Sequence, residues 1–372
     1  KTILIILFLG FSEARTQDIN NRGTEFWVGY GHHQQMEDGS NTQDMVLYFN
    51  TGAQPSRVKV YVYNNTLQAQ VLWLDTLLPA NFVFVSNTLP KSGPLDTRCY
   101  TPPCSFAPPG QACNGEGLFR RAILIKSTTP IAAYSHIYST ANSGATMLLP
   151  VESWGHLYFT ANSKQEYADN CFSWMYVIAQ HDSSWVEITP TQTTRGGSSG
   201  SQAAGVPFVV KMNRGEIYQI MAGGAGAAKP ELSGTKVRTL ANNQGDCFPV
   251  AVFAGSSRTH NPQPCGSGGG DNDNQQCFPT QVWGKRYLTA PTSSSSSATT
   301  FMTNSFKIIV KDPTTVVKRN GVVIPAASLQ LNTFYEIQGS NTPEYFESDK
   351  PIMVAQFMTG GGCLGGGPGG DP

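Results

Sequence analysis

The chain has 372 residues, and its 25 basic and 25 acidic residues give a formal net charge of zero. Only 13% of the residues are charged, against about 25% in an average protein, whereas Gly, Pro, Ser, Thr and Asn are abundant. This composition excludes the basic surface of a typical nucleic-acid-binding protein and argues against a mainly helical fold.

The N-terminal residues predict export from the cell. Lys1 precedes an apolar run over residues 3–11, and Ser12 and Ala14 supply the small residues that a signal peptidase requires. We interpret residues 1–14 as part of a signal peptide; a buried N-terminal strand is the alternative. The apolar run is too short to span a membrane. We therefore expect a secreted or cell-surface protein, and the start at Lys1 and the glycine-rich end indicate a fragment of a longer chain.

Short bursts of β-branched and aromatic residues, separated by turn residues about every ten positions, predict β-strands throughout the chain. They lie at residues 45–49, 58–63, 82–85, 122–125, 186–188, 208–210 and 306–310. Such spacing is typical of β-sandwiches.

One motif recurs along the chain. Its first copy consists of Pro150, Trp154, Gly155, Tyr158, Thr160 and Ala161. Its second copy has the same residue types at the same spacing, namely Pro279, Trp283, Gly284, Tyr287, Thr289 and Ala290. Tandem copies predict repeated structural units, in which the two tryptophans are buried at equivalent places.

Each copy ends in a proline followed by an apolar run, and a third such run lies upstream. The prolines are Pro130, Pro249 and Pro351, which we expect at strand starts or on edge strands because proline lacks an N–H donor. Trp27, with Gly29, is the candidate opening aromatic residue of the first unit. We therefore predict an all-β fold of three tandem β-sandwich-like modules with Gly-, Pro- and Asn-rich loops.

These signals divide the chain into six segments. They are the signal peptide (1–14), a first β module (15–140), a second (141–262), a loop rich in Gly, Asp and Asn between cysteines (263–277), a third β module (278–360) and a Gly-rich tail (361–372).

The first predicted loop carries candidate ligand-binding residues, because flat rings stack on sugar faces and side-chain amides hydrogen-bond hydroxyl groups. They are Tyr30, His32, His33, Gln34 and Gln35, and a later predicted loop adds the candidates Asp271 to Gln276. The histidine pair, followed by Glu37 and Asp38, also suggests a zinc site. Adjacent strand residues point to opposite faces, so this site requires a sharp turn, and histidines in a loop or interface are the alternative.

Eight cysteines fit an oxidising compartment, and the candidate disulfides are Cys265–Cys277 and Cys171–Cys247. The first pair encloses Asp271 and Asp273, which we expect to be exposed. Calcium binding there is one interpretation, and apart from it we expect no cofactor. The EF-hand pattern nevertheless fails, since Gln276 and Val282 occupy the positions of the required glycine and bidentate carboxylate. A solvated loop is the alternative.

No catalytic motif lies in a suitable context. Residues 196–200 match the nucleophile-elbow pattern, but no strand precedes them directly and no helix follows, as in a flexible hairpin loop. A hydrolase would have to use scattered carboxylates such as Glu37, Asp38 and Glu152. We therefore expect a protein that is not an enzyme.

Four segments resemble the N-terminal domain of the IgGFc-binding protein family: residues 23–30, 130–136, 143–150 and 251–256. The resemblance runs from about Gly23 to the C-terminus. The family is named for a mucus protein that associates with the Fc part of IgG, and similar domains occur in secreted and surface proteins of bacteria, particularly Bacteroidota. The resemblance implies architecture rather than a ligand, and it supplies no catalytic residues.

The leading hypothesis is a non-enzymatic extracellular or cell-surface segment that adheres to a glycoprotein, a mucin or a polysaccharide. The alternative from another class is a structural module of a surface layer, stalk or filament, which would self-assemble or pack against further domains of the same chain. An exported hydrolase is the third possibility.

Overall fold

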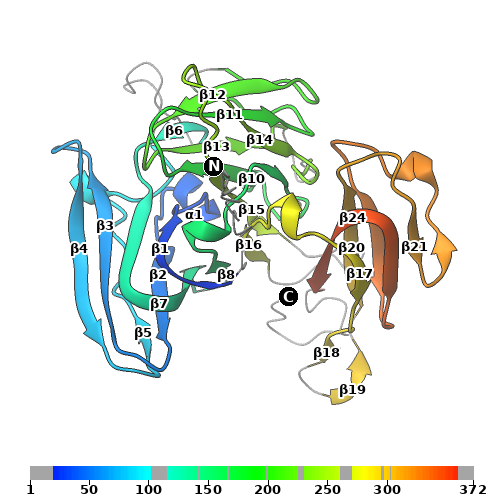
Figure 1. The fold of residues 1–372 in the computed structure, drawn as a ribbon, viewed down its shortest axis with the longest axis horizontal. Coiled ribbons are helices and arrows are strands. Elements are labelled where there is room, and N and C mark those ends of the chain that lie inside the picture. Colours follow the sequence, from blue (N-terminus) through cyan, green and yellow to red (C-terminus); the bar gives the residue numbers. More distant parts are fainter. Residues whose placement is uncertain are drawn as a thin grey trace, which may run out of the picture.

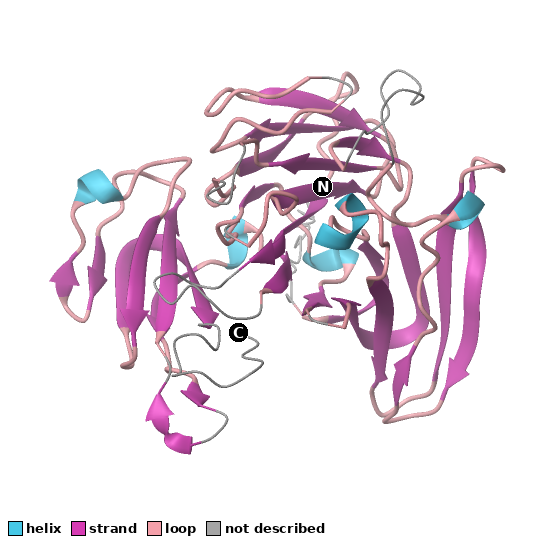
Figure 2. Cartoon of the chain, turned by 180° about the vertical axis from the view of Figure 1, so that it is seen from behind, coloured by secondary structure: helices cyan, strands magenta, loops and turns pink. Residues whose placement is uncertain are grey.

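The computed structural model describes residues 20–101, 115–140, 142–165, 167–197, 200–224, 230–259, 270–294, 297–301 and 303–358. Within these ranges the chain forms antiparallel sheets, and helix is confined to α1 (Gln34–Glu37) and a few 3-10 turns (Figures 1 and 2). The prediction of an all-β fold is confirmed. None of the helices in the described ranges has the length and apolar character needed to cross a membrane.

The first sheet has seven strands in the order β4-β3-β7-β2-β5, with β1 and β8 also paired to β7. Its strands are β1 (Arg22–Val28), β2 (Asp44–Thr51), β3 (Ser56–Asn64), β4 (Ala69–Leu78), β5 (Val83–Val85), β7 (Ile123–Tyr138) and β8 (Ser143–Leu148).

Two sheets form the middle of the molecule, in the orders β16-β15-β10-β13-β6 and β12-β11-β14-β9. Their strands are β6 (Gly117–Phe119), β9 (Leu157–Phe159), β10 (Ser173–Ala179), β11 (Ser184–Thr189), β12 (Phe208–Met212), β13 (Ile217–Met221), β14 (Lys236–Leu240), β15 (Val250–Thr259) and β16 (Asp271–Gln276).

The five-stranded sheet is buried on both faces. On β10, Trp174 and Tyr176 belong to a core that this sheet shares with the first sheet, whereas Met175 and Val177 belong to the core that it shares with the four-stranded sheet. Successive strand residues point to opposite faces, so every residue of β10 is buried. The five-stranded sheet therefore shares one apolar core with the first sheet and a second apolar core with the four-stranded sheet.

The C-terminal part has its own core and a six-stranded sheet in the order β22-β21-β24-β20-β23, with β17 also paired to β24. Its strands are β17 (Gly284–Leu288), β20 (Asn304–Val310), β21 (Val317–Arg319), β22 (Val322–Val323), β23 (Tyr335–Ser340) and β24 (Tyr345–Met358). A separate hairpin, β18 (Ser293–Ser294) with β19 (Ser297–Phe301), lies beside it.

Three sets of strands share one pairing pattern. The sets are β1 to β5 with β7, β9 to β15, and β17 with β20 to β24. In each set one strand lies between two others in the same order, β5-β2-β7, β13-β10-β15 and β23-β20-β24. We call β1, β9 and β17 the opening strands. The closing strands are β7 in the first set, β14 with β15 in the second and β24 in the third. Each opening strand pairs with the early part of its closing strand.

The two motif tryptophans are buried as predicted, with exposed fractions of 2% for Trp154 and 8% for Trp283. Their indole N–H groups donate to equivalent carbonyls, Leu149 O at 3.2 Å and Phe278 O at 3.3 Å. The motif tyrosines also match. Tyr158 Oη accepts from Gly155 N and donates to Val250 O, both at 2.7 Å, and Tyr287 Oη makes the same two bonds to Gly284 N and Ile352 O.

The structure corrects the expected start of the first copy. Gly23 lies opposite Ile131, the residue after Pro130, in the same way that Gly284 lies opposite Ile352. Counting from this glycine, the position of the motif tryptophan is Arg22 and the position of the motif tyrosine is Phe26. Trp27 is therefore not the counterpart of Trp154 and Trp283.

The prediction for the three prolines is correct for Pro249, which precedes β15, and wrong for the other two. Pro130 and Pro351 lie inside the long strands β7 and β24. Each occupies a break in the register with the opening strand, directly before the part that pairs with the second strand of the set. No ladder hydrogen bond is required there, so the missing N–H costs nothing.

Candidate binding site

The closing strands differ in what covers their second edge. In the first set, β8 pairs with residues 133–138 of β7, and in the second set β16 pairs with β15. In the third set, residues 353–358 of β24 pair with β20 on one side only within the described ranges. Among the described residues, no strand covers this second edge of β24, whereas the other two sets cover the equivalent edge.

A cavity of about 410 Å³ lies against the same stretch of β24. It is bounded on one side by residues 353–357 of β24 and on the other by residues 272–276 of β16, with Gly144 and Ala145 of β8 at one end. Figure 1 shows β24 ending on the side of the third set that faces β16. We call this space, together with the uncovered edge of β24, the slot.

The lining of the slot is a mixture of apolar and neutral polar side chains. The apolar contribution comes from Met353, Phe357 and Phe278, of which Phe278 is 40% exposed, and several amides line the opposite wall. Asp273 is the one carboxylate of the lining, and its Oδ2 accepts a hydrogen bond from the Ser163 hydroxyl. Burial raises the pKa of the Cys277 thiol to about 12, so this group is neutral at physiological pH. The slot therefore suits an uncharged ligand segment.

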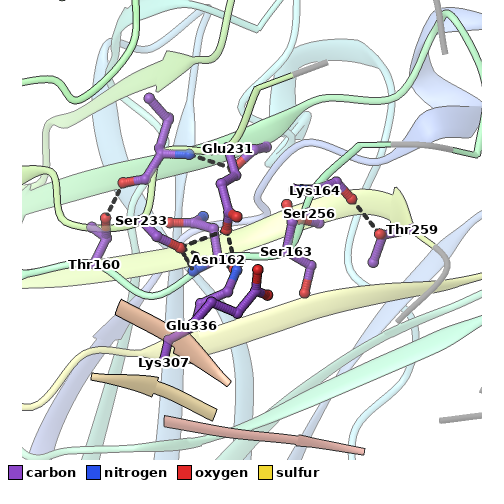
Figure 3. Close-up of polar contacts among 12 residues, drawn as sticks. Thr160, Asn162, Ser163, Lys164, Glu231, Ser233, Ser256, Thr259, Lys307 and Glu336 are labelled. Atoms are coloured by element: carbon purple, nitrogen blue, oxygen red, sulfur yellow. Dashed lines mark hydrogen bonds and ion pairs between the residues drawn. The ribbon is translucent and has the colours of Figure 1, made fainter. Parts of the chain in front are cut away.

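A buried ion pair fixes the third set to the middle sheets (Figure 3). Lys307 on β20 is 3% exposed, and its ammonium group pairs with Glu231 and donates to Asn162 O at 2.5 Å. The Glu231 carboxylate also accepts from the Ser233 hydroxyl at 2.7 Å. The Lys307 ammonium lies 5.0 Å from the centroid of the Phe357 ring, which lines the slot.

Burial dominates the electrostatics of this pair. It raises the pKa of Glu231 above the ordinary value, although Lys307 and the Ser233 hydroxyl favour the ionised form. Removal of one partner would leave the other charge buried and unpaired, which costs about 3–5 kcal/mol in comparable proteins. The two walls of the slot are therefore held at a defined separation.

Apolar packing also holds the third set against the middle sheets. Trp283 packs with Phe159 of β9 and Ile309 of β20, and the Phe159 and Trp283 ring centroids are 5.6 Å apart. Gly234 has a φ of +83°, and a Cβ atom at this position would lie 2.7 Å from Thr333 O. Only glycine allows the two backbones to approach so closely.

The five residues predicted to bind ligand in the first loop do not line the slot. Tyr30, His32 and His33 are at most 1% exposed, while Gln34 and Gln35 are partly exposed. Their contacts hold the loop: Tyr30 Oη donates to Gln43 O at 3.1 Å, and His33 caps α1 by accepting from Gln35 N. No partner can reach the rings of Tyr30 and His33 unless the fold opens.

The structure also assembles a chain of polar groups that resembles a hydrolytic triad. His32 Nδ1 lies 2.7 Å from Ser257 Oγ, and His32 Nε2 lies 3.1 Å from Glu37 Oε1. Burial would raise the pKa of Glu37, but hydrogen bonds from His32 and Arg195 lower it to about 2. Ser257 is fully buried, and its hydroxyl bonds both the N–H and the carbonyl of Phe172. A hydroxyl held in this way has no approach for a substrate.

The other hydrolase candidates lie elsewhere. Asp38 is the exposed residue that ends α1, and Glu152 belongs to the 3-10 turn Val151–Ser153. The nucleophile-elbow match includes Ser198 and Ser199, which lie outside the described residues.

The two candidate calcium ligands belong to strand β16 and not to an exposed loop. Asp271 is 5% exposed, and its Oδ1 accepts from Ser143 N, while Asp273 bonds Ser163. These bonds link β16 to its neighbours. The described residues contain no group of three His, Cys, Asp or Glu side chains arranged for a metal ion.

The predicted Cys171–Cys247 disulfide is absent, because the two residues lie at opposite ends of the β10–β15 ladder. That ladder pairs seven residues in register, so roughly 20 Å separates its ends at about 3.3 Å per residue, far beyond the reach of a disulfide. Cys247 is an exposed free thiol, and its Sγ lies 3.1 Å from Thr239 Oγ1. Cys277 is a buried free thiol, whereas its predicted partner Cys265 lies outside the described residues.

Sequence reasoning named one wall of the slot, residues 271–276, as a candidate binding segment but missed the other wall. It also placed residues 272–276, four amides and Asp273, in a solvated loop, although they belong to the strand β16. Met353 and Phe357 lie in an apolar run that reads as one more core strand. One signal in the sequence could have identified the slot. The segment after the first closing strand forms β8, which covers the edge of that strand, so a covering strand is expected in each copy of the repeat.

A comparison with protein families finds one match: the family model of the IgGFc binding protein matches residues 144–372. This range contains every residue that lines the slot. Comparisons with curated proteins and with solved structures give no match.

Proposed function

This chain belongs to the IgGFc binding protein family, and from that premise we propose that it acts outside the cell as a non-enzymatic binding segment whose partner is a glycoprotein. The family is one of extracellular binding proteins, not of enzymes. The full burial of Ser257 agrees with this proposal.

The observation that carries the proposal is the edge of β24 beside the slot, which no strand within residues 20–358 as described covers. A strand edge with unpaired N–H and C=O groups is a template for an additional strand. In the first and second sets the chain itself supplies that strand, as β8 and β16. In the third set, an extended segment of the partner polypeptide takes this position.

This mode of binding defines the partner segment. It runs antiparallel or parallel to residues 353–357, its backbone bonds β24, and its side chains alternate between the slot and solvent. The side chains that enter the slot are uncharged and meet Met353, Phe357 and the amides of β16. A segment without prolines and with alternating apolar residues fits best.

Two adjacent proline substitutions test this mode. The N–H groups of Ala355 and Gln356 point to opposite edges of β24, so one faces β20 and the other faces the slot. Ala355→Pro and Gln356→Pro therefore form a matched pair, of which one removes a ladder bond and the other removes a donor to the partner. Each variant is first compared with the wild-type protein by its urea unfolding curve.

Binding is then measured by biolayer interferometry with two probes, the Fc fragment of IgG and an unglycosylated mucin polypeptide. We expect at least one probe to bind the wild-type protein, and the stable member of the proline pair to lose that binding. Binding to neither probe contradicts the proposal, as does equal binding by the stable variant. Self-association that the same variant abolishes would instead support the alternative of a structural filament module.

A further inference from the structure

A second hollow lies on the outer face of the first sheet, outside the residues that the family model matches. Its volume is about 650 Å³. Three rings line it, those of Tyr48, His136 and Tyr138, together with Val46, Val85 and residues 86–88. We call it the aromatic groove.

The strand register aligns these rings. Alternate residues of β7 point outward, because Ala133, Ser135 and Ile137 are buried whereas Tyr134 and His136 are partly exposed. Tyr48 on β2 lies opposite Tyr134, and Val46 lies opposite His136. The outer face of β2 and β7 thus carries a row of partly exposed rings.

The rings contact one another. The centroids of His136 and Tyr138 are 5.0 Å apart and those of Tyr48 and His136 are 6.1 Å apart, with interplanar angles of 38° and 35°. Tyr48 Oη lies 3.4 Å from His136 Nδ1. These contacts restrict the rings to a shallow platform before any ligand arrives, which lowers the entropic cost of binding.

A polar rim accompanies the platform. Asn87 and Thr88 follow β5 and are exposed, and their side chains form no hydrogen bond with any other described residue. By contrast, the Ser86 hydroxyl is engaged, since it accepts from Leu47 N and donates to Asn87 O. The rim therefore offers one amide and one hydroxyl group to a ligand.

The groove is also uncharged. No Asp, Glu, Lys or Arg side chain lines it. Burial lowers the pKa of His136 below its ordinary value, so the imidazole is neutral at physiological pH. A charged ligand would find no counter-ion there.

We propose that the aromatic groove binds a neutral pyranose of a glycan. The C–H face of the sugar ring packs on the aromatic platform, and its hydroxyl groups bond the Asn87 amide and the Thr88 hydroxyl. An apolar peptide would leave these two polar groups without partners, whereas a sugar satisfies both. This inference rests on the proposed function, because it assigns the polypeptide of a glycoprotein to the slot and the glycan of the same glycoprotein to the aromatic groove.

Saturation-transfer NMR and titration calorimetry with galactose and N-acetylglucosamine oligomers test this site, with a glucuronic acid oligomer as the charged comparison. We expect a neutral oligomer to bind and the charged oligomer to bind more weakly. Tyr138→Ala and Asn87→Ala should each weaken binding about tenfold, the effect of losing one stacked ring or one amide contact. Tyr345→Ala serves as the matched control, because Tyr345 is 37% exposed and lies in the third set.

The outcomes separate the two sites. The stable member of the Ala355→Pro and Gln356→Pro pair should retain saccharide binding while it loses the polypeptide probe. Absence of binding by every neutral oligomer overturns the inference. So does unchanged binding by Tyr138→Ala and Asn87→Ala, whatever the result for the slot.

Discussion

Buried ionisable side chains are the residue-scale feature with measurable consequences. Glu116 is 2% exposed, and its carboxylate accepts from Thr194 Oγ1 at 2.6 Å and from Met221 N at 3.1 Å. Burial nevertheless outweighs these bonds and raises its pKa from 4.5 to about 7. The folded protein thus holds a proton that the unfolded chain releases at lower pH.

This difference predicts how stability depends on pH. The folded pKa of Glu116 exceeds the unfolded value, so its contribution is present below pH 4.5 and is lost as the pH rises toward about 7. The loss is on the order of 3 kcal/mol. Glu116→Gln removes it, so the variant should lose less stability than the wild type between pH 4.5 and pH 8 in urea unfolding.

Asp38→Asn removes an exposed carboxylate and serves as the control. It should leave the wild-type pH dependence in place. Equal losses of stability for the wild type and for Glu116→Gln would show that the Glu116 carboxylate does not remain protonated in the folded state.

At the scale of single elements, a tyrosine links the opening strand to the closing strand in the second and third sets. Tyr158 and Tyr287 bridge a glycine N–H and a carbonyl, whereas Phe26 occupies the same position in the first set without a hydroxyl. Tyr158→Phe leaves the buried N–H and carbonyl without this partner, which costs roughly 1–3 kcal/mol.

Urea unfolding of Tyr158→Phe, with Phe26→Leu as a packing control that removes no hydroxyl, measures this cost. A change below about 0.5 kcal/mol would show that the bridge does not contribute to stability.

The sequence allowed the strands and the repeated motif to be predicted better than the contacts that surround them. The motif spacing predicted the burial of Trp154 and Trp283, because identical spacing places residues in the same register. It did not predict that β10 is covered on both faces, since an apolar run does not show which sheet covers each face. It placed Tyr30 and His33 in an exposed loop, because aromatic and polar residues near glycines are typical of loops, and the long-range contacts that bury them leave no local pattern.

At the scale of the whole molecule, the Lys307–Glu231 ion pair and the packing of Trp283 fix the third set to the rest. Lys307→Met removes one charge and leaves the Glu231 carboxyl buried without its cation. We expect thermal unfolding to show a loss of about 3–5 kcal/mol. The double variant Lys307→Met with Glu231→Leu should recover most of it, because no buried charge remains.

If the single and double variants are equally unstable, the loss arises from packing and not from the unpaired charge. If the single variant is as stable as the wild type, the ion pair does not hold the third set against the middle sheets, and it does not fix the walls of the slot.

Hydrogen exchange of the backbone amides of β24 tests the central claim, that the third set offers an open strand edge. Residues 133–138 of β7, whose equivalent edge is covered by β8, provide the internal reference. In the free protein, alternate amides of residues 353–358 should exchange fast while those of residues 133–138 exchange slowly, and a bound Fc fragment should slow the fast ones. Slow exchange of all amides in residues 353–358 of the free protein, or fast exchange that persists with the fragment bound, would contradict the account.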